Sequence, residues 1–128
     1  MSEVPHSDDD RERLFALIDE GRKFVPEYLR DTYAMLMCAF PDTIPEEDYA
    51  YVLYILRERG MSDRSIGKVI AAVQSKVDFV DEAYYDTYID ASGDAPLAEE
   101  QIHDPQRLFG ITRRLIPCGF SEWFQLST

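Results

Sequence analysis

The sequence has little positive charge and no long apolar run. Thirteen Lys and Arg residues stand against 25 Asp and Glu, which gives a formal net charge of −12 over 128 residues. Such a balance keeps a protein soluble and repels both nucleic acid and anionic membranes. No apolar run approaches the about 20 residues that a membrane-spanning helix needs. The composition therefore argues against nucleic acid and against a membrane as partner.

Cysteine and histidine are also scarce, with two of each. Cys38 lies in the apolar run YAMLMCAF, and Cys118 lies in the turn-like IPCGF. Neither has a second Cys or a His at metal-site spacing, so we expect two reduced thiols, with Cys38 as a small core residue. The first ten residues, MSEVPHSDDD, are acidic and lack the apolar stretch of a secretory signal. Together these features predict a cytoplasmic protein with no metal ligands and no cofactor.

No catalytic signature is present in the sequence. Its histidines are His6, in the acidic N-terminal stretch, and His103, one residue before a predicted N-cap, and neither belongs to a recognisable catalytic motif. A glycine-rich phosphate loop, a GxSxG elbow and an HExxH motif are all missing. A calcium loop starting at Asp90 would place Ala95 where Gly is required and Gln101 where a bidentate Glu is required. We therefore predict no catalytic residues and no calcium site.

What the sequence does contain is a succession of helical patterns. Caps, prolines and periodic apolar residues predict helices over about 8–20, 26–40, 45–59, 63–76 and 105–116, with a shorter one starting at 78 or 81. The composition of residues 91–96 predicts a loop, and no window favours a strand. The predicted fold class is all-α, a compact bundle of five to six short helices. Residues 26–120 form the bundle, 1–25 an extension with a short helix, and 121–128 a tail.

The stretch RERGMSDRSIGKVIAAV, residues 57–73, is similar to the first part of a DNA-binding helix-turn-helix. Gly60 ends one predicted helix and Ser62 caps the next. The apolar stripe of that second helix is Ile66, Val69, Ile70 and Val73. A recognition helix should then follow with basic side chains, yet residues 78–100 contain eight acids and no Lys or Arg. Because phosphate would be repelled, DNA binding is disfavoured.

Two longer runs carry a resemblance to a known family. FPDTIPEEDYAYVLYILRERGMSDRSIGKVIAAV and the later DPQRLFGITRRLIPCGF resemble a family of small helical actinobacterial proteins of unknown function, best known from mycobacteria. The aromatic-Pro turn of that family corresponds to Phe40-Pro41, and its Pro-x-x-Asp-Tyr helix start to residues 45–49. The family closes on Gly-Trp-Pro, whereas this chain has Gly119-Phe120-Ser121. The resemblance covers roughly residues 28–120, and it implies a compact helical bundle and no reaction.

Tyrosines are the most suggestive remaining feature. The predicted helix 45–59 is apolar nearly all round, which is typical of a central helix or of one that contacts a second subunit. Aromatic rings that cannot all face one core are enriched at protein interfaces, although in a small bundle they can also fill space. The residues that we predict to contact a partner are Tyr51, Tyr54, Ile55, Tyr84, Tyr85 and Tyr88.

The sequence therefore predicts a small, acidic, non-catalytic module that binds a protein partner or forms a homo-oligomer. One alternative is an acidic decoy, in which residues 78–100 occupy the nucleic-acid-binding site of a partner. Another alternative is an enzyme without a recognisable motif, which would need a pocket that joins His103 to a carboxylate.

Overall fold

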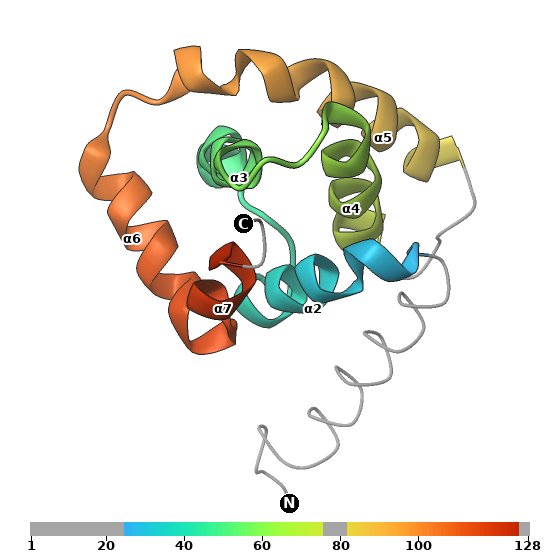
Figure 1. Ribbon diagram of the computed structural model, residues 1–128. Coiled ribbons are helices and arrows are strands. Elements are labelled where there is room, and N and C mark those ends of the chain that lie inside the picture. The colour runs from blue at the N-terminus through green and yellow to red at the C-terminus, as the bar shows by residue number, and fades with distance from the viewer. Residues whose placement is uncertain (1–24, 76–81, 126–128) are drawn as a thin grey trace, which may run out of the picture.

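The chain folds into helices joined by short connections (Figure 1). The structure is a computed structural model that describes residues 25–75 and 82–125. In chain order the elements, with η for a 3₁₀ helix, are η1 (Glu27–Leu29), α2 (Arg30–Ala39), α3 (Glu46–Glu58), α4 (Asp63–Ser75), α5 (Glu82–Asp94), η2 (Ala95–Gln101), α6 (Pro105–Leu115), η3 (Ile116–Cys118) and α7 (Phe120–Gln125). No strand occurs in these ranges, so the predicted all-α class is confirmed. The predicted extension 1–25 lies outside the described residues except for Val25.

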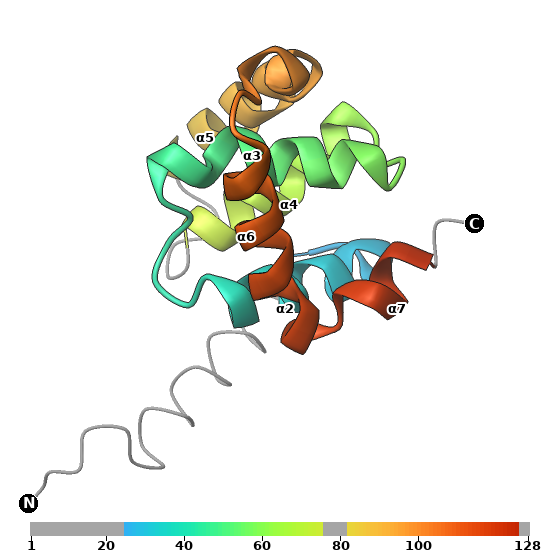
Figure 2. The same ribbon diagram turned by 90° about the vertical axis from the view of Figure 1, so that its left-hand side faces the viewer.

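Helices α3 and α4 form the middle of the molecule. They lie between α2 on one side and α5 with η2 on the other (Figure 1). After η2 the chain returns through α6 to α2, and α7 ends beside α2 (Figure 2). Among the helices of the described ranges, none combines the length and the apolar character needed to span a membrane.

The corner between α3 and α4 is built as the sequence predicts. Gly60 ends α3 with a left-handed φ of 104°, a conformation that glycine adopts without a side-chain clash. The Ser62 hydroxyl accepts a hydrogen bond of 3.1 Å from the Ser65 backbone N–H, which caps α4. Arg57 forms an ion pair with Asp63 across the turn. The helix-turn-helix-like pattern is therefore a structural corner inside the bundle.

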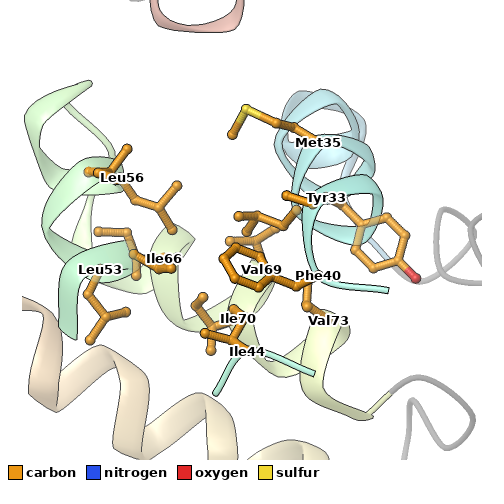
Figure 3. Packing of buried hydrophobic residues seen from close by; sticks show 14 of the residues in the cluster. Tyr33, Met35, Phe40, Ile44, Leu53, Leu56, Ile66, Val69, Ile70 and Val73 are labelled. Carbon is orange, nitrogen blue, oxygen red and sulfur yellow. The ribbon is translucent and has the colours of Figure 1, made fainter. Parts of the chain in front are cut away.

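The core lies where α2, α3 and α4 meet. Figure 3 shows apolar side chains from the three helices gathered there, among them Tyr33, Met35, Phe40, Leu53, Leu56, Ile66, Val69, Ile70 and Val73. The predicted stripe on α4 is fully buried, as are Leu53 and Leu56 of α3. Full burial of one such side chain is worth about 1.5–3 kcal/mol, so this junction supplies much of the driving force for folding.

Helix α5 packs more extensively on α4 than any other pair of elements does. Gly67 of α4 is buried at this contact, and a Cβ atom placed there would lie 2.0 Å from Ser92 Oγ and 2.8 Å from the Tyr88 carbonyl oxygen. Ala71 of α4 and Ala91 of α5 are also fully buried. Small residues on both helices thus allow the two backbones to approach closely.

The predicted loop over residues 91–96 is wrong. Its first residues complete α5, and η2 begins at Ala95. Ala91, Ala95 and Ala98 are all buried, and they recur at helical spacing. Ser, Gly, Asp and Pro in this stretch favour a loop locally, but burial of the alanines outweighs that weak preference. Pro96 is tolerated because the first turn of a helix does not use its N–H.

Three side chains near the C-terminus fasten the end of the chain to α2. We call Arg114, Cys118 and Trp123 the C-terminal clamp. The Arg114 Nε donates a hydrogen bond of 2.6 Å to the Ala39 carbonyl oxygen. The Trp123 indole Nε1 donates another of 2.6 Å to the Thr32 hydroxyl oxygen, deep in the protein. These bonds satisfy buried polar groups that would otherwise destabilise the fold.

The third member of the clamp is a disulfide between Cys38 and Cys118. The prediction of two reduced thiols is therefore wrong, and so is the placement of Cys38 in the core, because Cys38 is exposed. The two residues are 80 positions apart in the chain, and only the tertiary structure brings their Cα atoms to 5.8 Å. Their sequence surroundings carry no sign of this proximity.

The described residues of the predicted tail, 121–128, are helical. Phe120–Gln125 forms helix α7, and Trp123 within it is buried. The guanidinium of Arg59 lies 4.7 Å from the centre of the Trp123 ring, and its Nε donates a 2.8 Å hydrogen bond to the Trp123 carbonyl oxygen. Helix α7 is thus held by both α2 and the end of α3.

Substitution of Gly67 tests the contact between α4 and α5. Gly67→Ala is expected to lower the free energy of unfolding by about 1–3 kcal/mol, because the methyl group has no room. Urea unfolding followed by circular dichroism measures this loss. Gly93→Ala is the matched control, since Gly93 lies on α5 with open space around it. Equal stability of the two variants would contradict the close approach.

Removal of the disulfide tests the covalent part of the clamp. The double substitution Cys38→Ser and Cys118→Ser should lower the free energy of unfolding by about 2–4 kcal/mol, because the unfolded chain loses a long-range constraint. The same urea series measures the change. An unaltered unfolding midpoint and slope would show that the crosslink contributes nothing to stability.

Candidate functional site

The α3 residues of the predicted interface belong to the core. Tyr51 and Ile55 expose only 7% and 5% of their surface. The Tyr51 hydroxyl oxygen accepts a 3.1 Å hydrogen bond from the Asp104 backbone N–H at the start of α6. Tyr54 is half-buried against the core. Helix α3 is apolar nearly all round because α4, η2 and α6 all pack on it.

The α5 residues of the predicted interface behave differently. Tyr85 is 57% exposed, whereas Tyr88 is half-buried and contacts α4 near Gly67. The side chain of Tyr84 lies outside the described part of the chain. Ile89, one turn after Tyr85, is 64% exposed, and sequence reasoning missed it. Its exposure follows from the burial of Ala91 on the opposite side of α5, which the sequence alone does not show.

Two parallel rows of side chains run along the outside of α5. Residues four apart lie on the same side of a helix, so Tyr85 and Ile89 form an apolar row. Asp86, Asp90 and Asp94 form an acidic row beside it. Helix α5 and η2 lie at the outer edge of the molecule, and no other labelled helix lies beyond them (Figure 1). We call Tyr85, Asp86, Ile89, Asp90, Asp94 and Leu97 the acidic-apolar face.

A cleft of about 240 Å³ lies at the η2 end of this face, between α3 and η2. Leu53, Leu97 and the small residues Ala50 and Ala98 give it an apolar lining. Its polar lining is Glu46, Tyr49, Asp94 and Gln101. Leu97 is half-exposed, so the cleft and the acidic-apolar face share both Leu97 and Asp94.

Tyr49 connects the two sides of the cleft. Its hydroxyl donates a hydrogen bond of 3.4 Å to Asp94 Oδ2. Burial raises the pKa of Tyr49 well above its ordinary value, and the negative charges of Asp94 and Asp90 raise it further. The hydrogen bond places the Asp94 end of the acidic row at the cleft.

The site combines carboxylates with apolar side chains. Its carboxylates and apolar side chains suit a ligand that is both cationic and apolar, because opposite charge and apolar contact are then satisfied together. Residues 90–101, whose sequence does not fit a calcium loop, are helical. Within residues 25–75 and 82–125, no group of three His, Cys, Asp or Glu side chains is placed to hold a metal ion. His103 is exposed in the link between η2 and α6.

Comparison with known proteins adds no relative to this description. No protein-family model matches the chain, and neither a curated protein nor a solved structure is significantly similar to it. The resemblance to the actinobacterial family stays a prediction.

The pKa of Tyr49 generates a prediction about alkaline stability. Above pH of about 10 the tyrosine of the unfolded chain ionises, whereas folded Tyr49 stays neutral. The unfolded state then binds fewer protons than the folded state, so stability falls as pH rises through this range. Between pH 8 and pH 11 the melting temperature of Tyr49→Phe should therefore fall less than that of the wild type, as measured by calorimetry.

Tyr54→Phe is the control for this experiment, because it removes a hydroxyl from the same helix without touching the cleft. An identical alkaline loss in Tyr49→Phe and the wild type would contradict the raised pKa of Tyr49 in the folded protein.

Proposed function

We propose that the protein is a small non-catalytic module that acts by binding another protein through the acidic-apolar face. The observation that supports this most directly is the exposure of Tyr85, Ile89 and Leu97 along one edge of the molecule. Single exposed apolar residues are common, but neighbouring ones beside a cleft mark interaction surfaces. The other side of α5 is fixed on α4, so this edge is rigid enough to serve as a docking surface.

A different protein is favoured over a second copy as the partner. Two copies that met through this face would bring Asp86, Asp90 and Asp94 of both chains together, and like charges at an interface oppose association. The net charge of −12 opposes self-association in the same way and disfavours nucleic acid. The cytoplasmic location stays a prediction.

The proposal is tested by removing the apolar part of the face. The partner is captured by chemical crosslinking in the source cells. The double variant Ile89→Ser with Leu97→Ser should no longer crosslink to it, because the apolar contact is lost. The melting temperature should change little, since both side chains are largely exposed. Crosslinks formed by the wild type should map to α5 and η2 by mass spectrometry.

Phe109→Ser with Ile116→Ser is the matched control. It removes two equally exposed apolar side chains from α6 and η3, away from the face. The proposal fails if both double variants recover the same proteins as the wild type, or if the control alone loses them.

A further inference from the structure

We propose that the occupant of the acidic-apolar face is a basic amphipathic helix of the partner protein, and that one of its Lys or Arg side chains enters the cleft between α3 and η2. This inference rests on the proposed function, and it adds the chemical class of the partner. It combines three features of the face: the acidic row, the apolar row and the cleft.

The acidic row has no cationic partner among the described residues. No Lys or Arg occurs from residue 77 to residue 106. Among the described residues, the ion pairs are those of Arg57 with Asp63 and of Arg107 with Asp48, and no cation pairs with the row. Like charges one turn apart destabilise a helix, so Asp86, Asp90 and Asp94 oppose the folding of α5. A partner that brings positive charge to the row relieves this repulsion.

The apolar row sets the form of the partner. Tyr85 and Ile89 lie one helical turn apart, directly beside the acidic row. A helix with apolar residues at positions i and i+4 can contact both, while Lys or Arg at its flanks reaches the neighbouring carboxylates. A wholly polar basic segment would leave the exposed Tyr85 and Ile89 uncovered, so the amphipathic form is favoured.

The cleft has the two environments that a Lys or Arg side chain needs. Such a side chain has an apolar stem and a charged end, and it buries the first while the second stays near water or a carboxylate. Leu53 and Leu97 line the apolar part of the cleft, and Glu46 and Asp94 line its polar part. The 3.4 Å hydrogen bond from the Tyr49 hydroxyl to Asp94 Oδ2 supports this, because it places that carboxylate at the cleft.

Labelled synthetic peptides test the inference with the full protein. A helical peptide of Leu and Lys with an amphipathic pattern should bind, as followed by fluorescence anisotropy, and its affinity should fall with added salt. A peptide of the same pattern with Glu in place of Lys should not bind. Ile89→Ser should lower the affinity for the Leu and Lys peptide about tenfold, because apolar burial is lost.

A pair of charge variants separates specific from general attraction. Asp86→Asn with Asp90→Asn should lower the affinity for the Leu and Lys peptide about threefold to tenfold, because two charge contacts are removed. Asp42→Asn with Glu58→Gln changes the net charge equally at exposed positions on other parts of the molecule, and it should leave the affinity unchanged. If the two double variants lowered the affinity equally, the binding would be non-specific charge attraction, and the inference would be overturned.

The remaining outcomes separate this inference from the proposed function. If the Leu and Lys peptide does not bind while crosslinks in cells still map to α5 and η2, the partner class is wrong and the proposed function stands. If the protein alone forms a concentration-dependent dimer in ultracentrifugation that Ile89→Ser abolishes, the occupant is a second copy and the inference fails.

Discussion

The close contact between α4 and α5 at Gly67 decides which side of α5 faces solvent. With no side chain at Gly67, the backbones meet over Ser92 and Tyr88, and Ala91 is buried between the helices. Rotation of α5 about its axis would drive a larger side chain into α4, which a close-packed interior does not accommodate. The exposed Tyr85 and the acidic row are therefore consequences of packing on the opposite side of the helix.

Several arginines are engaged in contacts away from the acidic row of α5. Arg57 and Arg107 form ion pairs at the starts of α4 and α3, Arg59 stacks on Trp123, and Arg114 bonds to the end of α2. These arginines stabilise turns and helix ends, so they cannot balance the carboxylates of α5 and η2. Among the described residues, the carboxylates of Asp86, Asp90 and Asp94 are thus left without an ion-pair partner.

Local physics made much of the fold predictable from the sequence. The helix end at Gly60, the cap at Ser62 and the apolar stripe of α4 each follow from residues close together in the chain. The structure contains all three features. The disulfide and the burial of Trp123 depend on residues far away in sequence, so no local pattern carries them. For the candidate site, the tyrosine content indicates Tyr85 but not Ile89, because the exposure of Ile89 depends on the packing of the opposite side of α5 against α4.

The clamp on α2 combines bonds of two different kinds. Disulfides persist in oxidising compartments and are opened by the thiol buffers of reducing ones, whereas hydrogen bonds are indifferent to redox potential. Cys38 is exposed, while the indole of Trp123 is buried on Thr32. The covalent link between α2 and η3 therefore depends on the redox state of the surroundings. The hydrogen bonds that position α7 do not depend on it.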